Sequence, residues 1–508
     1  MRPPASESAL FQHTPDLSAT LKREWEPGCQ PDEVYGEYLP TWRAWMRNKL
    51  VDRLRRENVW MAEWQKRVRT ERRDKFFYYS AVFGTHTFFM MFLPILFFFG
   101  RPWEARGLLY VVGTGIYVSS YVKDLVCTPR PYSPPVIRLS DSLNTGFPSS
   151  HSTNSTSIAL FFGQWLFNLR HDVGYLWLLI LDTVLAIYAA SVIGGRVYTG
   201  MHSTADIIGG SIMGIVCWIF WIVVREPFDR WIMTGSWTVP AVIVPFVLGL
   251  IHFHPEPMDD CPCFEDAIAV LSVILGCILV EWVPLGGVAP WLQATDPGAF
   301  YRYDIITQVL VGIARLVLGE CIEPGLIFAK RRVGLGIMFA WRLIAKATLL
   351  RVLPPTFRAF SHILHTQLPT RRFYTAATDY KDVPRQAFRP IPSVLDLQSG
   401  TSSPAASSPT HSPLLTPQRV PSFNGKGRSP SPMALSQANL RLRALRRESG
   451  GAVASNGDVR EKPLKVRTMA LKYDAEVLTK VGVYGGIGFM ACGVIPYLFE
   501  IIEQSILS

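Results

Sequence analysis

The sequence predicts an all-α protein, a polytopic bundle of about eight to ten transmembrane helices that is followed by a disordered Ser/Pro-rich segment. The first observation is composition: 49% of the residues are hydrophobic and only 18% are charged, whereas soluble proteins carry about 25% charged residues. The second is distribution, because the charges collect between long apolar runs. A helix that crosses a bilayer needs roughly 20 apolar residues and satisfies every backbone group internally.

The N-terminal region, residues 1–75, is polar and ends in a basic run. Between Arg43 and Lys75 the basic residues alternate with Trp60 and Trp64. One interpretation is a helix that lies on a membrane surface with its tryptophans at the interface. A solvated helix is the alternative interpretation.

Residues 76–353 are predicted to form the transmembrane core. The predicted spans are 76–100, 107–123, 153–169, 175–193, 204–224, 239–253 and 267–283. Two further segments, 305–327 and 335–353, contain charges and are expected to be packed or partly interfacial helices.

The C-terminal part of the chain divides into two regions. Residues 354–475 contain repeated Ser-Pro pairs and are predicted to be largely disordered, because such composition cannot build a core. This segment is either a regulated, lipid-contacting tail or an unconstrained linker. Residues 476–508 contain a last predicted helix, 481–502.

Net charge and cysteines exclude some functions. The formal charge is +11, but the basic residues lie beside apolar segments, so anionic lipids are expected as partners and nucleic acid is not. Cys261 and Cys263 lack a second pair at metal-ligand spacing, and no metal or other cofactor is predicted. No oligomeric state is predicted.

Three polar clusters lie at the ends of predicted spans, where polar residues are costly and mark function. The first, residues 123–131, contains Lys123 and Arg130, which can donate several hydrogen bonds to one dianion. Alone, such residues usually anchor a helix to lipid headgroups.

The second cluster, residues 148–151, opens a predicted span with Ser149, Ser150 and His151. Backbone N–H groups at a helix N-terminus favour an anion, and His151 could donate a proton. Taken alone, this cluster is better explained as an ordinary serine cap with an interfacial histidine.

The third cluster, residues 196–206, contains Arg196, His202 and Asp206. His202 and Asp206 are four residues apart and would share one face of a helix. A carboxylate that holds one imidazole nitrogen fixes the tautomer and leaves the other nitrogen to attack. A structural His–Asp contact is the alternative.

The number of membrane crossings between the clusters predicts that all three lie on the same side. The first two flank the loop after the second predicted span, and the third follows the fourth span. Two crossings separate them, so all three are expected on one side of the membrane. Converging donors, two histidines and a carboxylate indicate a phosphate-handling site.

The motifs Lys-x6-Arg-Pro, Pro-Ser-x-His and Arg-x5-His-x3-Asp resemble those of the type 2 phosphatidic acid phosphatase (PAP2) superfamily, and within it the sphingosine-1-phosphate and long-chain base phosphate phosphatases. The resemblance covers residues 76–227. Two positions depart from the pattern: Gly195 stands where a serine is usual, and Ser150 where a glycine is usual.

The resemblance implies a role for each site residue. Lys123, Arg130, Ser149, Ser150 and Arg196 would bind phosphate, and positioning and electrostatics would supply most of the catalysis. His202 would be the nucleophile, Asp206 would orient it, and His151 would protonate the leaving alcohol.

The expected substrate is a sphingoid base 1-phosphate, on resemblance alone. Phosphatidate or another glycerolipid phosphate is the alternative, and a non-enzymatic channel or transporter is the alternative from another class. A sphingoid base carries an ammonium group, for which Asp141 or Asp124 could supply a carboxylate.

Two arguments about sidedness conflict. The basic run before the first span favours a cytosolic N-terminus, which would place the site in the cytosol. The family implies a site in the lumen of the endoplasmic reticulum, and the acidic loop 256–266 on the catalytic side agrees. We therefore expect a multi-pass protein of the endoplasmic reticulum membrane with a lumenal site.

Overall fold

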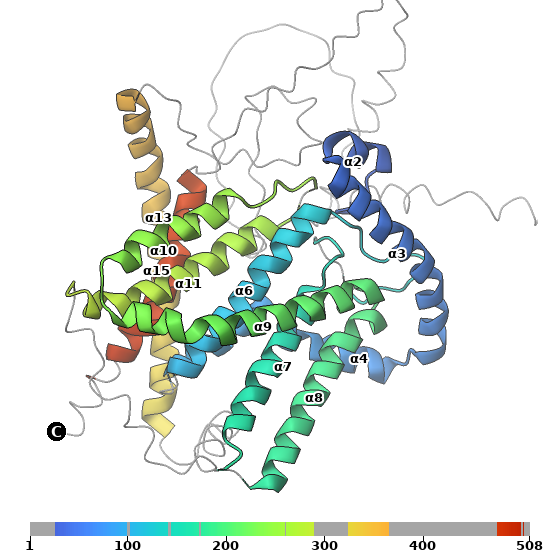
Figure 1. The fold of residues 1–508 in the computed structure, drawn as a ribbon, viewed down its shortest axis with the longest axis horizontal. Coiled ribbons are helices and arrows are strands. Elements are labelled where there is room, and N and C mark those ends of the chain that lie inside the picture. The colour runs from blue at the N-terminus through green and yellow to red at the C-terminus, as the bar shows by residue number, and fades with distance from the viewer. Residues whose placement is uncertain are drawn as a thin grey trace, which may run out of the picture. The chain divides into compact units, whose positions relative to one another are not determined.

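The computed structural model of the chain describes residues 26–98, 102–140, 144–171, 174–259, 261–288, 324–364, 475–498 and 501. Three predictions fall wholly or mainly outside these residues: the helix at 305–327, the tail at 354–475, and the position of Asp141. Within the described ranges all regular structure is helical (Figure 1), which confirms the predicted fold class.

Helices and the loops between them make up the described chain. Their bounds are α2 (Asp32–Tyr38), α3 (Thr41–Val68), α4 (Glu71–Ser80), α5 (His86–Phe98), α6 (Pro102–Val126), α7 (Ser150–Asn168), α8 (Tyr175–Tyr198), α9 (Thr204–Met233), α10 (Thr238–His252), α11 (Cys263–Leu285), α13 (Pro324–Leu364) and α15 (Ala475–Phe489).

Five helices of the described chain are long and apolar enough to cross a membrane: α8, α9, α11, the segment Val333–Phe357 of α13, and Ala475–Leu498, which includes α15. The helix α10 is apolar but shorter. The protein is therefore a multi-pass membrane protein. The predicted first span, 76–100, has the wrong bounds, because a 3-10 turn at Ala81–Gly84 separates α4 from α5. Thr85 then caps α5 by accepting a hydrogen bond from the N–H of Phe88 at 3.2 Å.

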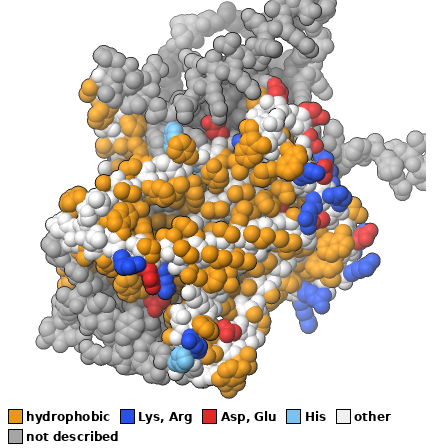
Figure 2. Space-filling view, viewed as in Figure 1, with side chains coloured by type: hydrophobic (Ala, Val, Ile, Leu, Met, Phe, Trp, Pro, Cys, Tyr) orange, Lys and Arg blue, Asp and Glu red, His pale blue; other side chains and the backbone are white. Residues whose placement is uncertain are grey.

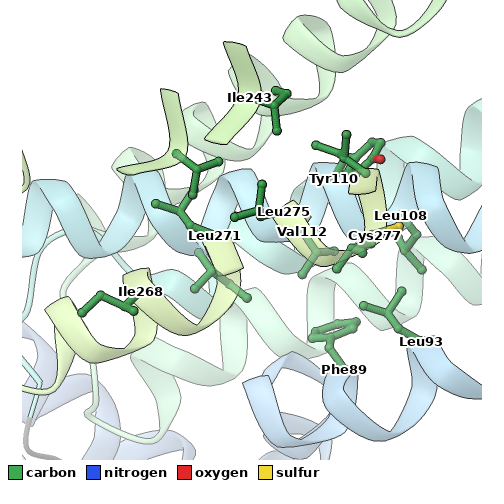
Figure 3. Close-up of a cluster of buried hydrophobic side chains, with 14 of the residues drawn as sticks. Phe89, Leu93, Leu108, Tyr110, Val112, Ile243, Ile268, Leu271, Leu275 and Cys277 are labelled. Carbon is green, nitrogen blue, oxygen red and sulfur yellow. The ribbon is translucent and has the colours of Figure 1, made fainter. Parts of the chain in front are cut away.

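The core is built around α6 and α11, which run antiparallel. Arg106 near the start of α6 pairs with Glu281 near the end of α11, and Gly113 lies against Val270 and Ile274. Figure 3 shows the apolar side chains between these helices and their neighbours. They include Leu93, Leu108, Val112, Ile268 and Cys277, all of them buried.

The last helix, α15, packs on this core through glycines. A Cβ atom on Gly276 of α11 would lie 1.9 Å from the carbonyl oxygen of Gly485. A Cβ atom on Gly488 would lie 2.3 Å from the carbonyl oxygen of Val273. Small residues let helix backbones approach closely within a bilayer, so the C-terminal helix belongs to the bundle.

The N-terminal helix α3 lies across the loops that follow α6 rather than standing apart from the bundle. Gln65 of α3 is buried, and its side-chain amide donates to the carbonyls of Ile137 and Tyr198, each at 3.0 Å. Arg47, also buried, donates to the carbonyl of Cys127 at 3.2 Å. One face of α3 is therefore buried against the protein, which a fully solvated helix would not show, and its place on a membrane surface stays a prediction.

The outer surface of the bundle is apolar. Figure 2 shows hydrophobic side chains over much of the face formed by α9 and α10, while Lys and Arg gather at the edge where α3 and α4 lie. Large apolar side chains of α8 and α9, among them Trp177, Ile187, Ile212 and Phe220, are exposed. A soluble surface rarely carries so large an apolar patch, and a bilayer covers it.

Candidate active site

The three motifs meet at one end of the bundle, as the count of membrane crossings predicts. The Lys123 Nζ atom, at the end of α6, donates to the Ser150 Oγ atom at the start of α7, at 3.2 Å. The N–H of Ser149 donates to the carbonyl oxygen of Asp206 at 3.0 Å. Arg130 donates to the carbonyl oxygen of Met201 at 3.1 Å. Each motif therefore contacts at least one of the others.

Two residues that the sequence analysis did not single out join the first two motifs. The carbonyl oxygen and the Oγ1 atom of Thr128 accept hydrogen bonds from the N–H groups of Gly146 and Phe147, each at 2.8 Å. A Cβ atom on Gly146 would lie 2.3 Å from the carbonyl oxygen of Pro129. Only glycine allows this approach, and the single sequence gave no signal beyond the proximity of Gly146 to the second motif.

Ser149 is the N-cap of α7 and is fully buried. Its Oγ atom accepts from the N–H and the Oγ of Ser152, at 3.3 and 3.0 Å. A serine hydroxyl has one hydrogen in addition to its two lone pairs. The hydroxyl of Ser149 can therefore still donate to an anion while it caps the helix. Ser150 is the first residue of α7, where free backbone N–H groups favour negative charge.

His202 and Asp206 are close, but not because they share a helix face. His202 precedes the N-cap Ser203 of α9, so it lies outside the helix. Ser203 and Asp206 form a capping box: the Asp206 Oδ2 atom accepts from the N–H of Ser203 at 2.8 Å, and Ser203 Oγ accepts from the N–H of Asp206 at 3.2 Å. The prediction of a shared face is corrected, since the capping box places the carboxylate.

The same Asp206 Oδ2 atom lies 3.5 Å from the Nδ1 atom of His202. This distance is longer than an ordinary hydrogen bond, and such contacts often tighten when substrate binds. The carboxylate is therefore positioned to accept a hydrogen bond from Nδ1–H once the two atoms approach, an arrangement that would leave the lone pair on Nε2.

Cations surround His202, which is 1% exposed. Burial lowers the pKa of His202 well below 6.5, and the charges of Arg130, Lys123, His151 and Arg196 lower it further. This lowered pKa favours the neutral imidazole at physiological pH.

The phosphate-binding candidates Lys123, Arg130 and Arg196 are each no more than 7% exposed. Burial, followed by the charge of Arg138, lowers the pKa of Arg130 to about 9. Buried cations are unfavourable unless an anion neutralises them. A bound phosphate dianion would supply that charge.

Arg196 and His151 come from two different helices. Arg196 is in the last turn of α8, and its Nε atom has no hydrogen-bond partner within the described chain. His151 is half-buried in the first turn of α7 and faces Gly84. At the departure from the family pattern, a Cβ on Gly195 would lie 2.9 Å from the Phe77 ring, so the ring occupies the space of the usual serine.

A second polar cluster lies beside the site. Asp124 is buried, with its Oδ2 atom 3.6 Å from the Nδ1 atom of His254. Its carboxylate and the sulfurs of Cys261 and Cys263 lie close enough together to hold a metal ion, but the two cysteines form a disulfide. The disulfide removes both thiolate ligands. Because Asp124 faces His254, it is a poor partner for a substrate ammonium.

The fold and this cluster of residues define a class of protein: a multi-pass helical membrane protein with a buried, cation-rich histidine site at one end. Comparisons with known proteins agree. The model of the PAP2 superfamily matches residues 104–230. The chain is 30% identical to a dihydrosphingosine 1-phosphate phosphatase of Schizosaccharomyces pombe, over 62% of this chain and 72% of that protein.

Two further relatives are similar to the chain. A dihydrosphingosine 1-phosphate phosphatase of Saccharomyces cerevisiae is 33% identical over 58% of this chain and 73% of its own length. Human sphingosine-1-phosphate phosphatase 2 is 28% identical over 53% of this chain and 68% of its own length. No solved structure shows a significant match. The chain belongs to the PAP2 superfamily, and the predicted enzyme class, a phosphoric monoester hydrolase, agrees with this membership.

Proposed function

We propose that the protein hydrolyses sphingoid long-chain base 1-phosphates to the free base and inorganic phosphate. The observation that carries the proposal is the neutral, buried His202, with Asp206 on its Nδ1 side and cations around it. The choice of lipid is supported by the two yeast relatives, which are dihydrosphingosine 1-phosphate phosphatases.

The residues support a two-step reaction. In the first step the Nε2 atom of His202 attacks phosphorus, the bond from phosphorus to the ester oxygen breaks, and His151 gives its proton to the departing lipid alkoxide. In the second step His151 takes a proton from water, which attacks phosphorus and breaks the phosphorus–nitrogen bond. Phosphate leaves, and both histidines return to their starting protonation states.

Binding of the phosphoryl group is assigned to five residues. We propose that Lys123, Arg130 and Arg196 neutralise the equatorial oxygens in the transition state. The hydroxyl of Ser149 and the N-terminus of α7 at Ser150 would add hydrogen bonds. Arginine and lysine thus perform the neutralisation that Mg²⁺ performs in kinases, and activity is expected without a metal ion or cofactor.

We further propose that the protein resides in the endoplasmic reticulum membrane with its site in the lumen. The loop that carries the Cys261–Cys263 disulfide follows α10, and it contacts the end of α6 because Met258 packs against Cys127 and the two sulfurs lie beside Asp124, which supports a position on the catalytic side. Disulfides persist in oxidising compartments such as the lumen. Residues 256–266 also contain no Lys or Arg, which suits the non-cytosolic side.

The test is phosphate release from dihydrosphingosine 1-phosphate by purified protein, with and without EDTA. His202→Ala should lower kcat by about 10³-fold or more. Acid quenching of the wild type should trap a phosphohistidine that this variant lacks. His171→Ala is the matched control, because His171 is exposed in the turn after α7, and it should retain full activity. Full activity of His202→Ala would refute the mechanism.

The substrate requires a panel of lipid phosphates. We expect higher kcat/KM for sphingoid base 1-phosphates than for phosphatidate or other glycerolipid phosphates. The reverse order would assign the protein to glycerolipid phosphates while leaving the chemistry unchanged. Absence of phosphatase activity in wild-type protein that is correctly folded would instead favour a non-enzymatic function.

A further inference from the structure

An apolar cavity of about 170 Å³ lies between α5, α6, α11, α13 and α15, apart from the catalytic residues. Its walls are mainly aliphatic and aromatic, and they include Leu93, Val112, Ile116, Val270 and Val273. Engineered cavities of roughly this size bind small apolar molecules such as benzene. The cavity therefore has room for part of a hydrocarbon chain, and the rest of a long chain would extend into the surrounding bilayer.

The cavity and the phosphate site lie on one face of α6. Leu109, Val112 and Ile116 line the cavity, and Lys123 continues the same series at helical spacing. Lys123 lies seven positions after Ile116, which corresponds to about 10 Å along a helix axis. The distance from a phosphate at Lys123 to the cavity along this face is therefore within the length of one long-chain lipid.

Acidic residues lie at the end of the cavity nearest the site. Glu265 and Asp266 are in the first turn of α11, and both line the cavity. Glu265 is already neutralised, because its Oε1 atom lies 2.8 Å from the Nζ atom of Lys480. Asp266 is half-buried, and its charge acts on both Lys123 and Asp124. It therefore lines the cavity and is also within electrostatic range of the end of α6 that carries Lys123.

The phosphate-binding cations, the carboxylate of Asp266 and the apolar cavity correspond to the phosphate, the ammonium and the hydrocarbon chain of one class of lipid. A sphingoid base 1-phosphate carries its phosphate on the first carbon, an ammonium on the second, and its long chain beyond the third. A carboxylate next to a phosphate site repels a phosphate dianion, unless a cation of the substrate lies between the two charges. A site of this kind favours phosphates that carry an amine and disfavours those without one.

We infer that Asp266 binds the ammonium group of the substrate and that the cavity between α6 and α11 receives the first part of its chain. This inference rests on the proposed function, because it names the residue that would select a sphingoid base from among lipid phosphates. It replaces Asp124 in that role, because Asp124 faces His254.

The test compares Asp266→Asn with the wild type on two substrates of equal chain length, dihydrosphingosine 1-phosphate and octadecyl phosphate, which lacks the amine. We expect kcat/KM for the amine-bearing substrate to fall about 10- to 100-fold, the loss typical of a charged hydrogen bond. Activity on octadecyl phosphate should be unchanged or higher. Glu256→Gln is the matched control, because Glu256 is an exposed acid just before the same helix, and it should leave both activities unchanged.

The outcomes separate the inference from the proposed function. Equal losses on both substrates would mean that Asp266 only positions Lys123, and no loss on either would mean that it does not contact the lipid; each overturns the inference. A wild-type protein that hydrolyses neither substrate overturns the proposed function itself.

A cavity-filling variant tests the chain site independently of charge. Ala269→Phe places a ring in the cavity, which Ala269 lines, whereas Ile215→Phe adds a ring on the exposed surface of α9. We expect only Ala269→Phe to raise KM for the long-chain substrate relative to a short-chain analogue, by about tenfold. The same chain-length preference in both folded variants would overturn the assignment of the cavity. If Ala269→Phe does not fold, Val112→Phe is measured in its place, because Val112 lines the same cavity from α6.

Discussion

At the scale of single residues, the main feature of the site is that Asp206 has two tasks. Its Oδ2 atom accepts from the N–H of Ser203 and also lies 3.5 Å from the Nδ1 atom of His202. The first contact caps α9, and the second can fix the tautomer of the histidine. One carboxylate thus links the start of a membrane helix to the orientation of the proposed nucleophile.

Asp206→Asn and Asp206→Ala should separate these tasks. Both remove the carboxylate, so we expect kcat to fall about 10²- to 10⁴-fold in each, since a misoriented histidine is a poor nucleophile. Asparagine keeps an oxygen for the cap, whereas alanine should lower the free energy of unfolding by about 1 kcal/mol. Kinetics together with thermal unfolding in detergent would check this. Equal stability of the two variants would contradict the capping role.

The pKa of His202 predicts a pH dependence of stability. Its folded pKa lies below 6.5, so the unfolded chain binds this proton more readily than the folded protein. The contribution of His202 to the free energy of unfolding is fully present above pH 6.5. It is lost as the pH falls below that value, by at most about 1.4 kcal/mol per pH unit. We expect His202→Gln to lose less stability than the wild type between pH 7 and pH 5. An identical loss in both proteins would show that His202 is not held neutral.

At the scale of helices, α7, which carries the second motif, and α9, which begins with the end of the third motif at Asp206, pack unusually closely. A Cβ on Gly210 would lie 2.5 Å from the carbonyl oxygen of Ser149, and a Cβ on Gly214 would lie 2.5 Å from that of Thr153. These glycines let the two helix backbones touch, so Ser149 meets the backbone of Asp206. The geometry of the site therefore depends on Gly210 and Gly214, because any larger side chain would push the two helices apart.

Gly214→Ala should separate α7 from α9. Its methyl group meets backbone that cannot move cheaply, so we expect a loss of about 1–3 kcal/mol and reduced kcat. Gly194→Ala is the control, since nothing lies within 4 Å of a Cβ at that exposed helical position, and alanine should stabilise the helix slightly. Thermal unfolding and activity of both variants would check the prediction, and equal effects would contradict it.

At the scale of the whole described molecule, the N-terminal region and the loop before α11 join at the catalytic end. The buried Asp259 accepts hydrogen bonds from the N–H of Gly28 at 3.0 Å and from the hydroxyl of Tyr35. The same end of the bundle holds the loops after α6 that contact α3. The N-terminal region, this loop and the site therefore share one side of the membrane.

This arrangement predicts the outcome of a topology experiment. Epitope tags placed at the N-terminus and at Glu256, which is exposed, should be accessible together or protected together under selective permeabilisation. Protection of both in cells whose plasma membrane alone is opened would support a lumenal site. Opposite accessibility of the two tags would contradict the contacts of Asp259.

The sequence predicted those features that depend on local composition. Apolar runs must become helices in a bilayer, because every backbone group has to be satisfied there, so the fold class followed directly. The number of predicted membrane crossings between the motifs then placed Lys123, Ser150 and His202 at one end of the bundle. The sequence could not predict the break at Gly84, where polar and apolar residues follow one another without a charged boundary.

The sequence by itself determined the helical membrane class, the residue types at the site and the end of the bundle where they gather. The tertiary structure decided how they meet: the capping box that carries Asp206 to His202, the glycines between α7 and α9, and Asp266 at the end of a cavity. The reason is physical. Helix formation and hydropathy depend on neighbours in the chain, whereas close packing and charge placement depend on residues distant in sequence, and a single chain shows no pairing between them.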